Sequence, residues 1–472
     1  MNHPDNPFAL NRRAFLGRYA GCLGTLALAD LLATNSGLLA AEAKPGVPAT
    51  RPAGKAKAVI CLFQHGGPSQ MDLFDAKPEL VKQHGKPYPG ELEVHFDKQK
   101  GNLLASPFKF APHGQSGIEL SELLPHTAEI VDDLTLVRSM ATESVDHEAA
   151  LRLIHTGKIQ AGRPVFGSWV TYALGSESRE LPSYVVLSDP GGLPVDGVRN
   201  WSSGWLPAVF QGTTFRSGAS PVLNLATPAE TPAAARAEQL RLVEALNRAH
   251  LARHRDSSEL AARIANFETA ARMQTAAPEV IDFSGETEAT RRLYGLDNPA
   301  TQEYGSRCLL ARRLVERGVR FVQVFLSGQP WDTHSKNAES LKGLCGRTDQ
   351  PSAALVKDLK QRGLLDSTIV LWTGEFGRLP VSQGNDGRDH NRHAFSLWLA
   401  GGGFKAGYAH GQTDPFGYRS VEQVVNVHEL HATLLYALGL DHARLAYPHD
   451  GRNDSLTDAE VTHAGVVRAL LA

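Results

Sequence analysis

Short apolar segments recur along the chain between longer amphipathic stretches. The first, Ala56–Phe63 (AKAVICLF), is followed at once by the turn-forming residues His65-Gly66-Gly67-Pro68. A short apolar segment bounded in this way is typical of a strand that is buried on both faces. We predict six strands of this kind: Ala56–Phe63, Leu134–Arg138, Ser183–Leu187, Val319–Leu326, Ser367–Trp372 and Ser396–Ala400.

Amphipathic helical patterns lie between these strands. Strands that alternate with helices form a mainly parallel sheet covered on both faces, so the sequence predicts an α/β fold, a three-layer sandwich, over residues 57–472. A long, Ala-rich and charged stretch at about 231–300 is interpreted as a helical insertion in this domain. The other predicted helices are His147–His155, Pro164–Leu174, Gln302–Arg317, Pro351–Arg362, Val427–Leu438 and Asp458–Leu471.

The N-terminal residues show the features of a twin-arginine signal peptide in the expected order. Arg12-Arg13 precede Phe-Leu, a mildly apolar stretch follows, and a small-x-small cleavage site closes the segment. The stretch contains Asp30, so it is too polar for a stable membrane span. We predict that residues 1–43 direct export to the periplasm or elsewhere outside the cytoplasm, and that 44–56 are a linker. The alternative is an amphipathic N-terminal helix that happens to carry two arginines.

Charge and cysteine content exclude two classes of protein. The 48 basic and 50 acidic residues give a net charge of −2, which argues against a nucleic-acid partner. Of the four cysteines, Cys22 would leave with the signal peptide. The other three, Cys61, Cys308 and Cys345, cannot all pair, so the chain is not a disulfide scaffold. One bridge between two of them stays open.

Polar side chains with metal-binding capacity follow four of the predicted strands. Because the carboxyl ends of parallel strands meet at one edge of a sheet, we expect these side chains to gather there. Asp332 and His334 are two residues apart, so on an extended segment they point the same way. In chain order the set is Asp72, His147, Asp332, His334, Glu375, Arg378, Arg388, Asp389 and His390.

Five motifs around these residues together resemble one bacterial family. They are His65-Gly66-Gly67-Pro68-Ser69-Gln70, Trp331-Asp332-Thr333-His334-Ser335, Thr373-Gly374-Glu375-Phe376-Gly377-Arg378, Gly387-Arg388-Asp389-His390-Asn391 and Leu399-Ala400-Gly401-Gly402-Gly403. Over nearly its whole length the chain resembles an uncharacterised family of twin-arginine-exported proteins in the alkaline phosphatase and sulfatase superfamily. The resemblance implies the fold of that superfamily and a metal-centred site, without a settled activity.

The comparison with the superfamily also implies roles for single positions. Asp332 and His334 resemble its middle Asp/His ligand pair, and His390 resembles its last metal-binding histidine. Sulfatases carry their nucleophile as the Cys of a Cys-x-Pro-Ser-Arg motif, nine positions before the Thr of a Thr-Gly pair. Thr156-Gly157 resembles that pair here, so the resemblance places His147 at the nucleophile position. No Cys-x-Pro-Ser-Arg occurs in the sequence, so sulfatase chemistry through a modified cysteine is not expected.

Each of these residues also has a purely structural interpretation. A carboxylate after a strand caps a turn or pairs with an arginine, as Glu375 would with Arg378. The segment 383–391 is typical of an exposed loop because Asn-Asp-Gly is favourable turn chemistry, and His393 is an alternative to His390. The structural alternative stays open for His147, Asp332, Glu375, Asp389 and His390.

The set favours an exported, metal-dependent hydrolase of phosphate or sulfate esters. The predicted ligands of a divalent ion (zinc, manganese or calcium) are Asp72, Asp332, His334, Glu375, Asp389 and His390. His147 would act as ligand, nucleophile or acid/base, and Arg378 or Arg388 would hold the oxyanion. The expected substrate is a small anionic ester or a polysaccharide-derived ligand. The alternative function is that of a non-catalytic relative that binds an anionic ligand or a protein partner.

Overall fold

The computed structural model describes residues 54–216, 222, 232–254 and 258–472. The predicted signal peptide and most of the predicted linker lie outside these residues. The chain divides into two compact units, one formed by 46–226 with 265–472 and a smaller one that contains 227–264. Of the helices that the structure describes, none combines the length and the apolar character that a membrane crossing requires.

The larger unit is built on a mixed sheet whose strand order is β13-β5-β12-β9-β1-β8-β6-β7, with β16 beside β5. Every described pairing in this sheet is parallel except those that β12 makes with β5 and β9. The predicted α/β class with a mainly parallel sheet is therefore confirmed. The strands are β1 Ala58–Phe63, β5 Leu134–Ala141, β6 Tyr184–Leu187, β7 Thr213–Phe215, β8 Phe321–Phe325, β9 Thr368–Thr373, β12 Phe395–Ala400, β13 Tyr408–His410 and β16 Val425–Asn426.

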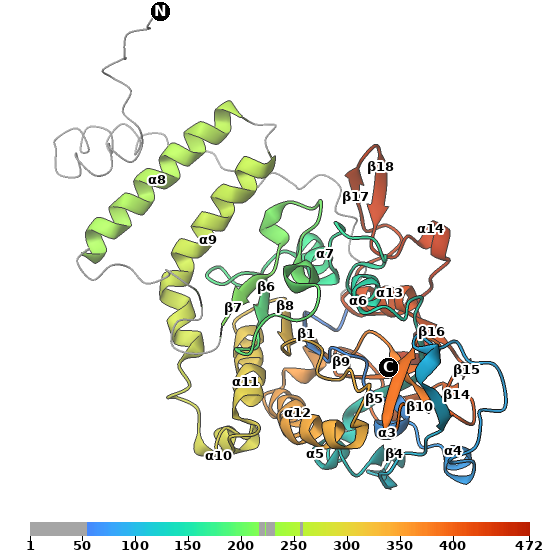
Figure 1. Cartoon of the computed structure of the whole chain (residues 1–472). Coiled ribbons are helices and arrows are strands. Elements are labelled where there is room, and N and C mark those ends of the chain that lie inside the picture. Colours follow the sequence, from blue (N-terminus) through green and yellow to red (C-terminus); the bar gives the residue numbers. More distant parts are fainter. Residues whose placement is uncertain (1–53, 217–221, 223–231, 255–257) are drawn as a thin grey trace, which may run out of the picture. The chain divides into compact units, whose positions relative to one another are not determined.

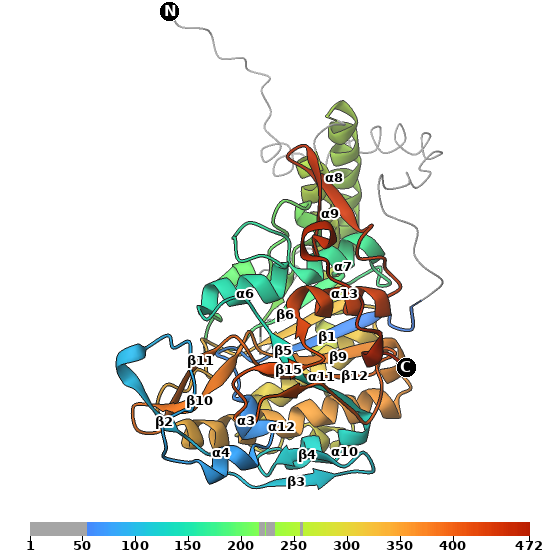
Figure 2. The same cartoon turned by 90° about the vertical axis from the view of Figure 1, so that its right-hand side faces the viewer.

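Helices cover both faces of this sheet, as Figures 1 and 2 show. Side chains of a strand alternate between its two faces, and in β1 Ile60 and Leu62 pack into one core while Val59 and Phe63 pack into the other. The first core lies under α11 Gln302–Glu316 and α12 Asn337–Gln361, and the second under α6 His147–Thr156, α7 Phe166–Leu174 and α13 Val427–Ala437. The result is the predicted three-layer arrangement.

The direction of β12 brings a further segment to the functional edge of the sheet. Its first residue, Phe395, lies opposite Met140 near the end of β5, so the chain that precedes β12 arrives where the parallel strands end. That chain forms the hairpin of β10 Gly377–Gln383 and β11 Gly387–Asn391, which pairs with β2 Lys100–Leu103. The alternative interpretation of 383–391 as an exposed loop does not hold for β11, because its five residues form a buried strand.

The remaining elements are short apart from two long helices. The C-terminal helix predicted over Asp458–Leu471 is wrong for most of that range: the α-helix covers only Ala459–Thr462 and ends at His463, whose φ of 53° is left-handed, and a separate 3-10 turn covers Arg468–Leu470. Cys61, Cys308 and Cys345 are all buried and free, so the bridge left open by the sequence does not form among them. The other elements are α3 Gln70–Leu73, α4 Pro78–Lys82, β3 Phe110–His113, β4 Ile118–Ser121, α5 Pro125–Ala128, α8 Ala233–Arg253, α9 Ser258–Ile281, α10 Glu288–Leu293, β14 Gln412–Thr413, β15 Ser420–Glu422, β17 Ala446–His449, β18 Arg452–Ser455 and α14 Ala459–Thr462.

Candidate metal centre

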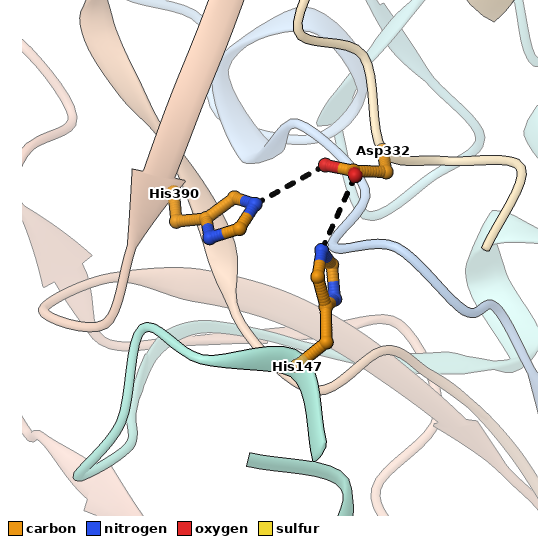
Figure 3. Close-up of side chains that lie close together, drawn as sticks. All are labelled: His147, Asp332 and His390. Carbon is orange, nitrogen blue, oxygen red and sulfur yellow. Dashed lines mark hydrogen bonds and ion pairs between the residues drawn. The ribbon is translucent and has the colours of Figure 1, made fainter. Parts of the chain in front are cut away.

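Asp332, in the loop after β8, is the centre of the candidate site. Its Oδ1 lies 2.9 Å from Nε2 of His334 and 3.2 Å from Nε2 of His390, and its Oδ2 lies 3.4 Å from Nε2 of His147. Figure 3 shows His147 and His390 directed at the two oxygens of the same carboxylate. Residues that follow β5 and β8 and residues that precede β12 thus meet at one edge of the sheet.

Each of the three imidazoles is held by its other ring nitrogen. Nδ1 of His147 lies 2.7 Å from Oε1 of Glu375, and Nδ1 of His390 lies 2.6 Å from the carbonyl oxygen of Val145. Nδ1 of His334 contacts Oε1 of Gln383. These partners only accept hydrogen bonds, so in each ring the proton is assigned to Nδ1. A neutral ring in this tautomer leaves the Nε2 lone pair facing Asp332.

Lone pairs that converge on a carboxylate repel it unless a cation lies between them. The separations of 2.9–3.4 Å between Nε2 atoms and carboxylate oxygens match the roughly 3.3 Å between neighbouring ligands of a tetrahedral ion bound at about 2.0–2.1 Å. Among the described residues, buried Nε2 of His147 and Oε2 of Glu375 have no hydrogen-bond partner. An imidazole held through Nδ1 is the arrangement usual for metal-binding histidines. The residues present therefore fit a divalent metal ion.

The electrostatics of the metal-free protein favour one added positive charge. Burial lowers the pKa of His147, but the nearby carboxylates of Asp332 and Glu375 outweigh burial and raise the pKa to about 9. Burial, Arg378 and His147 lower the pKa of His390 to about 4, against the opposing contact with Asp332. Without metal, a proton on His147 supplies the charge, and His390 stays neutral.

A second group of potential ligands shares His390 with the first. It consists of His334, Asp389 and His390, and the other group consists of His147, Asp332 and His390. Asp389 is already engaged, because its Oδ2 accepts the backbone N–H groups of His95 at 2.9 Å and Phe96 at 2.8 Å and its Oδ1 accepts that of His390 at 2.8 Å. Asp389 therefore holds a neighbouring segment in place.

Arg378 and Arg388 lie behind the ligands, away from solvent. Both side chains are fully buried. Arg388 donates to both oxygens of Asp72, at 2.7 and 3.1 Å, and the charge of Arg388 overcomes burial to lower the pKa of Asp72. Arg378 donates to Asp332 at 2.6 Å and to four backbone carbonyls. In this arrangement the two guanidinium groups neutralise carboxylates and fix loops.

The structure separates the residues that the sequence left as alternatives. Nε2 of His393 lies 2.8 Å from Oε2 of Glu93, whereas Nε2 of His390 lies 3.2 Å from Oδ1 of Asp332, so His390 is the histidine that faces Asp332. Glu375 contacts His147 and accepts the backbone N–H of Gly66 at 2.9 Å. The hydrogen-bond partner of Glu375 among the predicted site residues is thus His147.

The sequence did not predict two glutamines that orient Asp332 and His334. Gln329 donates to Oδ2 of Asp332 at 2.8 Å, and Gln383 holds His334 while donating to Gln99 at 2.8 Å. Glutamine is common on surfaces, and no spacing in the sequence marks these two. Only the folded contacts reveal them.

Comparison with known proteins gives one family and a set of distantly similar structures. No curated protein matches the chain. A phosphonate monoester hydrolase from Silicibacter pomeroyi is 11% identical, with 87% of this chain and 78% of that chain covered and a TM-score of 0.32. An alkaline phosphatase superfamily protein from Vibrio parahaemolyticus is 11% identical, with 89% and 76% covered and a TM-score of 0.34. The lipoteichoic acid synthase LtaP from Listeria monocytogenes is 9% identical, with 83% and 74% covered and a TM-score of 0.32.

The family assignment rests on a match over most of the chain. The model of the family described as "Protein of unknown function (DUF1501)" matches residues 56–471. That range contains β1, which opens the central sheet, and every residue of the candidate metal centre. The chain therefore belongs to the DUF1501 family.

Proposed function

We propose that this protein binds a divalent metal ion at Asp332 and hydrolyses phosphate or sulfate esters. The observation that carries the proposal is the set of three imidazoles, each held at Nδ1 and each presenting Nε2 to one carboxylate. Imidazole nitrogens favour zinc over calcium, which takes oxygen ligands. The ligands would be His147, Asp332 and His390, with His334 beside them in contact with Asp332.

The N-terminus of α6 makes this site favourable for an anion. His147 is the first residue of α6, a helix of ten residues capped by Asp146, whose side chain accepts the backbone N–H of Ala149. The positive end of the helix dipole therefore lies at the site and favours a phosphate or sulfate group. A bound metal would polarise an ester oxygen and stabilise developing negative charge. Glu375 keeps the His147 ring in its orientation, and Arg378 does so for Asp332.

The test compares two histidines of the same segment. His390→Gln removes an Nε2 that faces Asp332, whereas His393→Gln changes a histidine that contacts Glu93. Protein purified without chelator is analysed for metal and assayed with aryl phosphates, phosphodiesters and sulfates. Wild type and His393→Gln should retain the metal and activity, and His390→Gln should lose both. Equal metal content in the two variants would contradict the proposal.

The same assay distinguishes the alternative function. A non-catalytic relative that binds an anionic ligand would keep its metal but turn over none of the esters. A metal-loaded wild type without turnover, which nonetheless binds inorganic phosphate, would favour that alternative. In that case the site would bind an anion without catalysing its hydrolysis.

Export is a further part of the proposal and rests on the N-terminal sequence. Arg12-Arg13 followed by Phe-Leu is the feature that supports the twin-arginine route. Changing both arginines to lysine keeps the charge and should leave precursor in the cytoplasm, as judged by fractionation. Normal export of that variant would contradict this part of the proposal and leave the metal site untouched.

A further inference from the structure

The candidate metal centre is least buried at His334. The side chains of His390, His147 and Asp332 are 4%, 10% and 11% exposed, whereas that of His334 is 27% exposed. A ligand therefore reaches the centre past His334. Side chains next to His334 would therefore contact the part of the ligand that points away from the metal.

Two aromatic side chains flank this approach. The ring of Phe96 meets the ring of His334 edge to face, with centroids 5.2 Å apart at 89°, and lies 6.3 Å from that of His390. The ring of His95 stacks on His390 at 5.1 Å and 21°. Phe96 nevertheless remains 40% exposed. A large apolar side chain thus faces solvent directly beside a group of charged and polar ligands.

The backbone holds Phe96 in this position through several contacts. The buried carboxylate of Asp389 accepts the N–H groups of both His95 and Phe96. Just before them, the hydroxyl of Tyr418 accepts the backbone N–H of Glu93 at 3.0 Å. Leu92 and Val94 pack against a small core of Met71, Leu80, Leu103, Leu379, Val381 and Tyr418. The exposure of Phe96 is therefore imposed by its surroundings.

We propose that Phe96, supported by His95, forms an apolar wall that contacts the organic group of the ester. The substrate class is then an ester whose organic part presents a planar or apolar ring beside the anionic group. A ring that packs on Phe96 removes apolar surface from water and makes an aromatic contact, and both are favourable. A methyl ester is too small to make that contact. This inference rests on the proposed function, since it assumes that the anionic group lies at the metal centre.

The test uses two phosphonates that differ only in the organic group. Binding of phenylphosphonate and methylphosphonate to the metal-loaded whole protein is measured by calorimetry. Wild type should bind the phenyl compound about three- to tenfold more tightly, the range that one aromatic contact provides. Phe96→Ala should bring the two affinities together, with methylphosphonate binding and metal content unchanged. Phe267→Ala, at an exposed phenylalanine of α9, is the matched control and should preserve the ratio.

The outcomes separate the two proposals. Equal affinities in wild type, or a ratio that survives in Phe96→Ala with full metal content, would overturn the role of Phe96 alone. Failure of both phosphonates to bind metal-loaded wild type would overturn the anion site itself, and the apolar wall with it. Phe96→Leu keeps an apolar side chain and should show an intermediate ratio, which guards against a general disturbance of the segment.

Discussion

Arginine neutralises a buried carboxylate at two neighbouring positions, with different results. At Asp72 the pair is closed, because Arg388, Ser69 and Asn337 together satisfy the carboxylate. At Asp332 the arginine shares the carboxylate with three imidazoles whose Nε2 atoms face it. Of these two carboxylates, only that of Asp332 faces ring nitrogens with which it could share an added cation.

The closed pair is expected to matter for stability and not for metal binding. Arg388→Met should lower the free energy of unfolding by about 3–5 kcal/mol, because it leaves the Asp72 charge buried without a partner. The double variant Asp72→Asn with Arg388→Met should recover much of that loss. Urea unfolding and elemental analysis together check this expectation. Loss of metal from a folded Arg388→Met protein would instead place Asp72 among the ligands.

Two buried histidines, His155 of α6 and His431 of α13, predict how stability depends on pH. Burial, with the charge of His431 adding to it, lowers the pKa of His155 to about 3, and burial likewise lowers that of His431 to about 3. The folded protein therefore excludes protons that the unfolded chain binds near pH 6.5. Stability is complete above that pH and is lost as the pH falls toward 3, by up to about 1.4 kcal/mol per pH unit for each histidine.

His431→Gln should reduce this loss. Glutamine can still donate to the carbonyl of Ile154, which His431 Nε2 contacts at 2.8 Å, but it does not titrate. Urea unfolding at several pH values between 6.5 and 4 should give a shallower slope than in wild type. Substitution of the exposed His84 by Gln provides the control. An unchanged slope in His431→Gln would mean that other groups govern the acid sensitivity.

At the scale of single residues, sequence motifs predicted which side chains meet but less of what each one contacts. Asp332, His334 and His390 were predicted together from their positions relative to strands and from the family resemblance. The partner of Arg388 was not predictable, because its contact with Asp72 spans most of the chain. The metal-binding roles themselves stay predictions until metal content is measured.

At the scale of elements, the start of α6 determines where His147 lies. Asp146→Ala should lower the free energy of unfolding by about 1 kcal/mol, because it removes the cap that accepts the N–H of Ala149. Asp146→Asn keeps an acceptor and should be close to wild type. Since the first turn carries His147, the alanine variant should also bind metal more weakly. Urea unfolding and metal titration measure the two effects, and equal behaviour of both variants would argue against the cap.

Strands made of apolar residues were predictable, whereas the hairpin at the site was not. β1, β8 and β9 are mostly apolar and fully buried, and hydrophobicity alone marks such segments. β11 reads Gly-Arg-Asp-His-Asn and is equally buried, but it is buried through ion pairs and hydrogen bonds with residues far away in the chain. Local sequence patterns do not report such partners, so the segment resembled a turn.

For the whole molecule, the metal is expected to stabilise the fold because it would link parts of the chain that are distant in sequence. Its proposed ligands come from α6, from the loop after β8 and from β11. Metal that binds only the folded state should raise the free energy of unfolding by about 2.7 kcal/mol when its free concentration is 100 times the dissociation constant. A chelator should reverse this gain in wild type and have no effect on Asp332→Asn. If chelator left the free energy of unfolding of wild type unchanged, as expected for Asp332→Asn, such a stabilising role of the metal would be excluded.

The order of strands in the sheet has a consequence for synthesis on the ribosome. β1 pairs with β8 and β9, which end at Phe325 and Thr373. At 5–20 residues per second, the chain needs roughly 13–52 s after β1 emerges before β8, the first of these two neighbours, is available. During that time an entirely apolar segment has neither of its neighbours in the sheet, and unpaired apolar strands readily associate with other chains. The nascent protein is therefore expected to occupy a ribosome-associated chaperone for longer than a protein whose first strand pairs with the next one.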